Sequence, residues 1–329
     1  MLALTTFILS VFFTACKKES RPPEFKISVV ASGLVNPMGI EADGAGNIWV
    51  SESGTAKNDA KVVLIKPNGK TYDAIVNLSA FINENSGEPQ GAAHLLLDFG
   101  ILYILLGTYM FKANVSSFKP GDAPIDGSKL PYEDIGSFVR SYPFVNNAHD
   151  THPYNLTKGP DGDIYIADAG ANAIIHRKSA GSYSVLAEIP GFANPTPVGP
   201  PQVQSVPTGL FFDGQNFLVT TLTGFPFITG KAVVYKVSPA GNVSLYQPGF
   251  TTLVDIVEGN MNGHLVLQYG AFGQTGFVPN TGSLILINGS SSQVLTNSLN
   301  MPVALKQVNP YTWYITSMGD GTVLKASYN

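Results

Sequence analysis

Four polar side chains near the middle of the chain have residue types and a spacing suited to chemistry. His149, Asp150 and His152 stand close together, and Asp168 follows after one short predicted strand. An imidazole that titrates near neutral pH can act as a general acid or base. Together with carboxylates, it can also bind Ca²⁺, Mg²⁺ or Zn²⁺. The same residue types often hydrogen-bond loop backbone and brace the start of a strand, so both interpretations remain open.

Two short predicted strands position these side chains. Pro153–Leu156 leads into the turn Gly159–Gly162, and the strand Asp163–Ala167 follows before Asp168. Gly and Asp supply the backbone angles that a tight reversal requires, so the segment predicts a β-hairpin. His152 and Asp168 would then lie at the same end of that hairpin.

The same pattern recurs about every fifty residues. In each copy an apolar residue stands three positions after the start of the unit, and the middle of an apolar strand follows eight residues later. The copies start at Pro37, Pro89, Pro153, Pro207, Leu253 and Pro302. Such a period indicates a repeat architecture in which each unit stacks on its neighbours.

Each unit continues with two more strands joined by turn residues, as in Lys61–Lys66, Pro67–Gly69 and Thr71–Val76. Four short strands per unit are typical of a propeller blade. The 34 Gly and 23 Pro of the 329 residues suit a turn-rich, all-β chain. We therefore predict one all-β domain over residues 25–329, a six-bladed β-propeller, with residues 118–127 as a loop insertion. The strand-like segment Glu24–Ala31 would complete the last blade and close the ring.

The N-terminus is predicted to be a targeting segment. Leu2–Ala15 is almost wholly apolar, is too short to span a membrane and ends in small residues before Cys16, the chain's sole cysteine. This resembles the lipobox of a bacterial lipoprotein, although Phe13 stands where Leu is usual and no Lys or Arg precedes the apolar run. Residues 1–15 would be the signal peptide, Cys16 the lipidated residue and 16–24 the tether. A plain cleaved signal is the alternative.

The charge balance limits the partners. The net charge is −4, and no Lys/Arg run occurs beyond the N-terminal region, which excludes a basic face for nucleic acid. We expect a monomer in the bacterial cell envelope, held at the outer membrane by the lipid on Cys16 and either periplasmic or surface-exposed.

In a propeller, the loops that enter the innermost strands meet at one mouth of the central channel, which is the default ligand site. Residues at blade starts and second-strand ends are expected to line it: Asn36, Glu52, Glu88, Gln90, Asp150, His152, Asp168, Asp255, Gln268 and Asp320. Seven of them are the candidates for a small-molecule or metal site that would take one divalent cation, Ca²⁺ or Zn²⁺: Asp150, His152, Asp168, Glu52, Asp255, Gln268 and Asp320.

Aromatic side chains in two long loops form a second group. Phe225, Phe227, Phe272 and Phe277 could cover one side of the mouth and stack on a planar or sugar ligand. Alternatively, these loops fold over and bury their own rings.

Several stretches resemble the ScyD/ScyE family of propeller proteins over about residues 30–329. The matching stretches are Asn155–Leu156, Ile164–Asn172, Val206–Leu210, Leu222–Phe227, Val234–Val237 and Gly249–Ile256. The resemblance implies a six-bladed propeller of the NHL and gluconolactonase-like kind that is often exported. It implies no particular activity, and His152 precedes Pro153 where the family pattern leads us to expect Asn.

Gluconolactonase-type propellers hold a metal through Glu, Asn and Asp near the axis, with the Asn commonly in a Pro-Asn-Gly segment. This chain instead has Met38, Tyr154, Thr208 and Val303 after the corresponding prolines. It also lacks a Gly-x-Ser-x-Gly nucleophile motif. We therefore expect a lipid-anchored scaffold that binds a small molecule or a protein at the channel mouth. A metal-dependent lactonase or hydrolase is the alternative.

Overall fold

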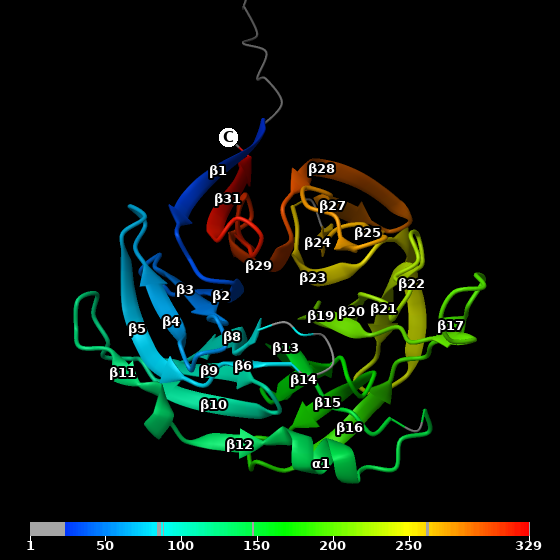
Figure 1. The fold of residues 1–329 in the computed structure, drawn as a ribbon, viewed down its shortest axis with the longest axis horizontal. Helices are drawn as coiled ribbons and strands as arrows, with labels where there is room; N and C mark the ends of the chain where they lie inside the picture. The colour runs from blue at the N-terminus through cyan, green and yellow to red at the C-terminus, as the bar shows by residue number, and fades with distance from the viewer. Residues whose placement is uncertain (1–23, 84–86, 88, 147, 261–262, 329) are drawn as a thin grey trace, which may run out of the picture.

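The computed structural model describes residues 24–83, 87, 89–146, 148–260 and 263–328. Six β-sheets are arranged around one central axis (Figure 1), and the prediction of a six-bladed, all-β propeller is confirmed. Cys16, the expected signal segment, most of the tether and Glu88 lie outside the described residues.

The blades follow one another along the chain, and the first strand of each is innermost. Blade one contains β2 (Pro37–Ala42), β3 (Ile48–Glu52), β4 (Ala60–Ile65) and β5 (Thr71–Leu78). Blade two contains β8 (Ala92–Asp98), β9 (Ile101–Leu106), β10 (Tyr109–Asn114) and β12 (Tyr132–Asp134). Blade three contains β13 (Pro153–Lys158), β14 (Ile164–Asp168), β15 (Ala173–Arg177) and β16 (Tyr183–Glu188).

The second half of the ring repeats this plan. Blade four contains β19 (Pro207–Phe212), β20 (Phe217–Thr221), β21 (Ala232–Val237) and β22 (Val243–Phe250). Blade five contains β23 (Leu253–Glu258), β24 (His264–Gln268), β27 (Gly282–Asn288) and β28 (Ser291–Leu299). Blade six contains β29 (Pro302–Asn309), β30 (Thr312–Ser317), β31 (Thr322–Tyr328) and the N-terminal β1 (Phe25–Ser32).

The ring is closed by strand β1. It pairs antiparallel with β31, from Phe25 opposite Tyr328 to Ser32 opposite Thr322, and so joins the two ends of the chain in one sheet. The predicted closure by the N-terminal strand is therefore confirmed. Pairing of the first strand with the last leaves no open gap in the ring.

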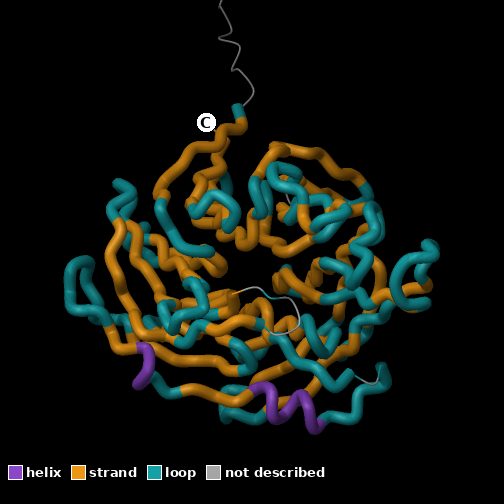
Figure 2. The backbone as a smooth tube through the Cα atoms, viewed as in Figure 1, coloured by secondary structure: helices purple, strands orange, loops and turns teal. Residues whose placement is uncertain are grey.

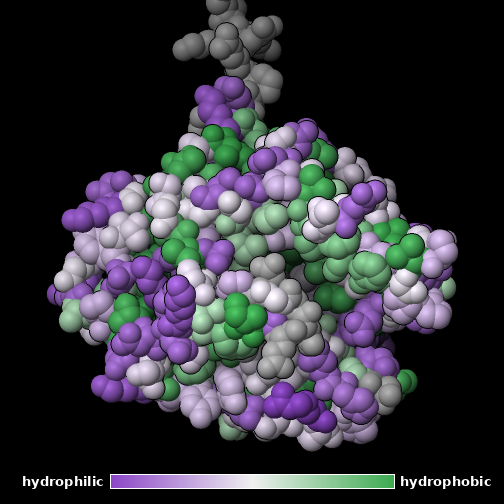
Figure 3. Space-filling view, in the orientation of Figure 1, coloured by the Kyte–Doolittle hydropathy of each residue, from purple (hydrophilic) through white to green (hydrophobic). Residues whose placement is uncertain are grey.

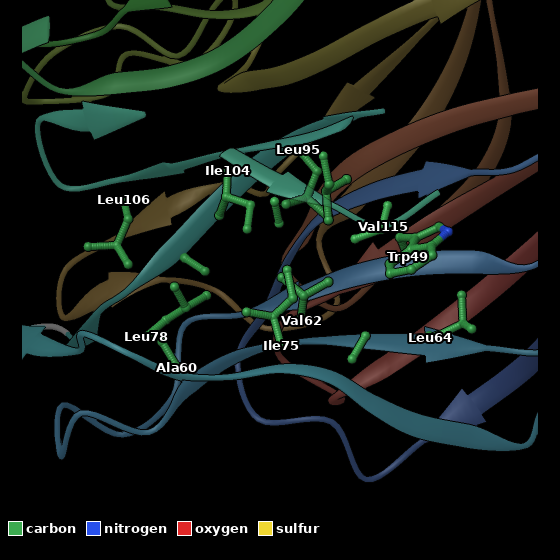
Figure 4. Packing of buried hydrophobic residues seen from close by; sticks show 14 of the residues in the cluster. Trp49, Ala60, Val62, Leu64, Ile75, Leu78, Leu95, Ile104, Leu106 and Val115 are labelled. Atoms are coloured by element: carbon green, nitrogen blue, oxygen red, sulfur yellow. The ribbon is translucent and has the colours of Figure 1, made fainter. Parts of the chain in front are cut away.

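The core is divided among the six contacts between neighbouring blades. Each hydrophobic cluster combines side chains of two adjacent sheets, as where Trp49 and Val62 of blade one pack near Leu95 and Ile104 of blade two (Figure 4). Every blade is thus buried on both faces, which explains why β3 and β14 are buried along their whole length. The blades hold one another in place, and the inner strands surround a channel along the axis.

Blade two departs from the spacing read in the sequence. The predicted start at Pro89 is three residues too early, because inner strand β8 begins at Ala92, which pairs with Leu106 as Pro37 pairs with Glu52. Pro89 belongs instead to β7 (Pro89–Gln90), which forms a separate two-stranded ribbon with β6 (Phe81–Ile82).

The predicted insertion leads into a fifth strand of blade one. After the loop at 118–124, β11 (Ile125–Asp126) adds parallel to β5, and the 3-10 helix Gly127–Lys129 follows. The sole α-helix in the described residues, α1 (Ile135–Ser141), lies at the outside of the ring (Figure 2) and packs where blades two and three meet. Two further ribbons pair β17 (Phe192–Ala193) with β18 (Gln202–Val203), and β25 (Phe272–Gly273) with β26 (Gly276–Phe277). Among the described residues, no helix has the length and apolar character needed to cross a membrane.

Candidate functional site

The mouth of the channel is a cavity of about 590 Å³ between the entering loops and the β25–β26 ribbon. We call it the mouth cavity. Its apolar lining comes from Met38, Met301, Met318, Tyr269, Phe272 and Phe277. Its polar lining comes from Asn36, Ser53, Gln90, His152 and Thr275. Apolar side chains border a hollow near the centre of this face (Figure 3). Of the residues expected at the mouth, five are therefore brought together: Asn36, Gln90, His152, Phe272 and Phe277.

A second cavity of about 1060 Å³ adjoins the first over blade two. This mouth groove shares Gln90, Gly107 and His152 with the mouth cavity. Exposed rings of Phe81, Tyr109 and Tyr132 line it. Asp150 also lines the groove; it is exposed and accepts a hydrogen bond from the backbone N–H of Thr151 at 2.8 Å.

His152 stands where the two cavities meet. Its backbone N–H donates to Asp168 Oδ1 at 2.7 Å, which fixes the residue just before β13 begins at Pro153. Burial lowers the pKa of His152, while the carboxylates of Asp168 and Asp150 oppose that shift. The ring is therefore neutral at pH 7 and offers one donor and one acceptor to the mouth.

Asp168 is turned away from the mouth and braces the loop before its blade. Its carboxylate accepts hydrogen bonds from Thr151 Oγ1 at 2.6 Å and from the backbone N–H of Ala171 at 3.0 Å, besides that of His152. It is fully buried, and burial raises its pKa despite these donors. All of these contacts are internal to the blade.

Glu52 and Gln268 occupy the same place in their blades. Each ends the second strand, opposite the first residue of the inner strand. Glu52 Oε2 accepts from the N–H of Val35 at 2.7 Å, and Gln268 Oε1 accepts from the N–H of Thr251 at 3.2 Å. Neither side chain lines the mouth cavity.

Asp320 is also occupied locally. It lies in the turn after β30, is exposed and accepts from Asn300 Nδ2 at 2.7 Å. Each of the two interpretations drawn from the sequence therefore holds for some of the polar candidates. His152 and Asp150 face the cavities, as a ligand site requires. The others hydrogen-bond nearby loops: Glu52, Asp168, Gln268 and Asp320.

The aromatic side chains of the two long loops are also partly buried and partly presented to cavities. Phe227, Phe272 and Phe277 pack together with ring centroids 4.7 to 5.1 Å apart, and Tyr269 adds an edge contact to Phe277 at 4.8 Å. Phe272 and Phe277 also reach the mouth cavity. Phe225 is 50% exposed and, with Phe227, lines a shallow outer pocket that Phe272 shares. The loops thus bury part of their rings and present the rest.

Deeper in the channel, the third residue of each inner strand forms one layer around the axis. We call this the channel layer, and it contains Gly39, His94, Asn155, Gly209, Asp255 and Ala304. Each inner strand is bulged at this level, because its register with the second strand shifts there. A bulge leaves backbone groups without a ladder partner, so each blade must satisfy them in another way.

Three blades use a hydroxyl on the second strand. In blade six, Thr316 Oγ1 accepts from Ala304 N at 3.0 Å and donates to Met38 O of blade one at 2.6 Å. In blade one, Ser51 Oγ accepts from Gly39 N at 2.8 Å and donates to Ala93 O of blade two. In blade four, Thr220 accepts from the N–H of Gly209. The small residue in the layer and the hydroxyl behind it therefore occur together.

The other three blades place a polar side chain in the layer itself. Asn155 and Asp255 each accept from the N–H of the residue that follows, and Asn155 Nδ2 donates to Asp255 Oδ1 at 3.0 Å. Asp255 Oδ2 accepts from Leu305 N of blade six at 2.7 Å. Burial raises the pKa of Asp255 to about 7. The residue expected at the mouth thus lies within the channel and joins blades three, five and six.

The third side chain of this kind is His94, which the sequence analysis did not single out. It is 3% exposed, and neither ring nitrogen has a hydrogen-bond partner among the described residues. Burial lowers its pKa to about 3, although the nearby backbone of Tyr154 and Val303 weakly favours the protonated ring. The Tyr154 ring packs against it with centroids 4.6 Å apart and separates it from the mouth.

The described lining of the mouth cavity supplies few ligands for the predicted divalent cation. No Asp, Glu or Cys from the described residues lines the mouth cavity, and one imidazole with amide groups is not a set that holds Ca²⁺ or Zn²⁺. Within the described part of the chain, Asp161, Asp163 and His176 are the one group of three such side chains close enough to share a metal. The two carboxylates lie in the turn between β13 and β14, and His176 of β15 places its Nε2 3.0 Å from Asp163 Oδ2.

These features define a six-bladed β-propeller with an apolar mouth and a polar channel. No family model matches the chain, and no curated protein matches it. Solved structures do match, all at low sequence identity. A catalytically inactive virginiamycin B lyase from Staphylococcus aureus with quinupristin is 14% identical, with a TM-score of 0.53 over 92% of this chain and 99% of that one.

Two further neighbours carry other activities. A gluconolactonase from Xanthomonas campestris is 10% identical, with a TM-score of 0.59 over 94% of this chain and 96% of that one. The PQQ-bound aldose sugar dehydrogenase from Streptomyces coelicolor is 13% identical, with a TM-score of 0.58 over 94% and 100%. Likeness at this identity shows the shared propeller fold alone.

Proposed function

We propose that this protein binds a neutral, largely apolar or planar small molecule in its mouth cavity and acts as a binding scaffold rather than an enzyme. The lining of the mouth cavity carries this proposal. Methionine and aromatic side chains adapt to and stack on apolar rings. In the part of the chain that the structure describes, no Lys, Arg, Asp or Glu lines this cavity. A charged ligand would therefore lose its hydration without gaining a counter-charge.

The chemistry suggested by the neighbours' names finds little support in this lining. A gluconolactonase-like metal has no carboxylate ligands there. An anionic cofactor such as PQQ needs cationic partners, and none of the described residues that line the mouth cavity or mouth groove is Lys or Arg. The alternative enzyme is a lactonase or hydrolase in which neutral His152 would act as the general base.

A substrate panel separates the two functions. The purified protein would be incubated with sugar lactones and aryl esters, with and without added Ca²⁺ or Zn²⁺, and compared with protein-free controls. We expect no turnover above the control rate. Turnover that His152→Ala abolishes, and that Tyr132→Ala of the adjoining groove leaves intact, would establish the enzyme instead.

We further propose that the propeller is exported, as proteins of the ScyD/ScyE kind that it resembles often are, and that a lipid on Cys16 anchors it. The apolar segment Leu2–Ala15 and the sole cysteine support this. Cys16→Ala should move the protein from the membrane fraction to the soluble fraction of cells, while Cys16→Ala and wild type should melt at the same temperature. Unchanged membrane association of the variant would contradict the anchor.

A further inference from the structure

The opposite end of the channel forms a small polar well. It is a cavity of about 210 Å³ lined by residues of all six inner strands, and we call it the axial well. His94, Asn155 and Asp255 of the channel layer line its inner part, and Glu41, Glu258 and Lys306 lie further out. A water molecule occupies about 30 Å³ of liquid, so the axial well has room for a hydrated ion or a small organic molecule.

The charges in the axial well do not balance. Asp255, Glu41 and Glu258 supply three carboxyl groups, whereas Lys306 is the single Lys or Arg among the described lining residues. Lys306 Nζ lies 2.6 Å from Glu41 Oε2 and forms an ion pair with it. Asp255 is 5% exposed, and its three hydrogen-bond donors are all neutral. A buried carboxylate of this kind is stabilised by a nearby cation.

A second observation, independent of the unbalanced charge, also points to a ligand in the axial well, and it concerns the ring of His94. Buried imidazole nitrogens normally have partners, but those of His94 make no well-formed hydrogen bond among the described residues, although the backbone of Tyr154 and Val303 lies near the ring. Because burial keeps this ring neutral, one nitrogen retains a lone pair that can bind a metal or accept a hydrogen bond. The Asn155 carbonyl oxygen adds an acceptor on the neighbouring strand, where it already receives the N–H of Leu156.

We propose that the axial well binds one small cation, with Asp255 supplying the charge and His94 and Asn155 supplying neutral acceptors. The cation expected from the sequence is thereby placed in the channel rather than at the mouth. A hydrated metal ion and a small primary ammonium ion share the required chemistry, since each seeks oxygen and nitrogen lone pairs around one positive charge centre. This site is independent of the mouth cavity and does not rest on the function proposed for it.

Titration calorimetry on the purified, metal-stripped protein tests the proposal, with CaCl₂ and ZnCl₂ as the metal probes and methylammonium chloride as the organic probe. We expect saturable binding of one ion per chain, either in the titrations with the metal salts or in the titration with methylammonium. These are the two arms of the experiment. Asp255→Asn should weaken it at least tenfold, and His94→Phe, which keeps a ring but removes both nitrogens, should weaken it severalfold. Should Asp255→Asn fail to fold, His94→Phe provides the same test.

Asp161→Asn is the matched control, because it removes the exposed carboxylate from the blade-three group that could also take a metal. Binding that survives Asp161→Asn and is lost in the channel variants supports the axial well. Three results would overturn it: no saturable binding in either arm, binding lost in Asp161→Asn alone, or binding unchanged in both Asp255→Asn and His94→Phe.

Discussion

The two ends of the channel are built from the same six inner strands but differ in chemistry. The mouth cavity is lined by Met, Tyr and Phe with one neutral imidazole, whereas the axial well contains three carboxyl groups and one ammonium. The channel layer lies between them. The difference shows that a repeated blade can carry two unrelated sites, because the loops determine one end and the strand residues the other.

The largest expected effect concerns the channel layer. Asp255→Ala removes the acceptor of three buried donors, from Asn155, Ile256 and Leu305. Leaving such donors without partners should lower the free energy of unfolding by roughly 3 kcal/mol. Urea denaturation followed by tryptophan fluorescence measures this, since Trp49 and Trp313 are both buried in blade contacts. A loss below about 1 kcal/mol would show that the layer does not join the blades.

A second contact between blades lies outside the channel and depends on a carboxylate, so its contribution to stability should change with pH. Glu133 joins blades two and three by hydrogen bonds from Arg177 and Tyr183 and an ion pair with Lys112. Although burial opposes it, these partners lower the pKa of Glu133 to about 2, below its ordinary value of 4.5.

Because the pKa of Glu133 is lower in the folded state, its contribution to stability is fully present above pH 4.5 and is lost as the pH falls toward 2. After allowance for its partial exposure, the contribution should be about 2 kcal/mol. Thermal melts of wild type between pH 6 and 3 should fall more steeply than those of Glu133→Gln. Parallel curves would contradict this pKa.

Much of the fold could be predicted from the sequence because blade starts and turns are local signals. Pro37, Pro153, Pro207 and Pro302 each begin an inner strand, and the alternating N-terminal segment closes the ring as β1. Blade two was misplaced since Pro89 begins a loop ribbon rather than its inner strand. The repeat spacing, which was counted from a proline at the start of most units, could not distinguish a proline that begins an inner strand from one that begins a loop ribbon.

The site was less predictable. Spacing placed Glu52, Asp168 and Gln268 correctly at the ends of second strands, but it does not give the direction of a side chain, and these three turn to loop backbone. His94 was missed for a traceable reason. With blade two aligned at Ala92, His94 occupies the same third position as Asn155 and Asp255, so the signal was present but out of register.

The most direct test of the central claim compares two fluorescent probes of the mouth cavity. N-phenyl-1-naphthylamine is neutral, and 8-anilinonaphthalene-1-sulfonate has a similar ring system with a negative charge. We predict saturable binding of the neutral probe, at least tenfold tighter than that of the anion. Phe272→Ala should weaken it, while Phe225→Ala in the outer pocket should not. Equal or tighter binding of the anion, or a neutral-probe affinity unchanged by Phe272→Ala, would contradict an apolar binding site at the mouth.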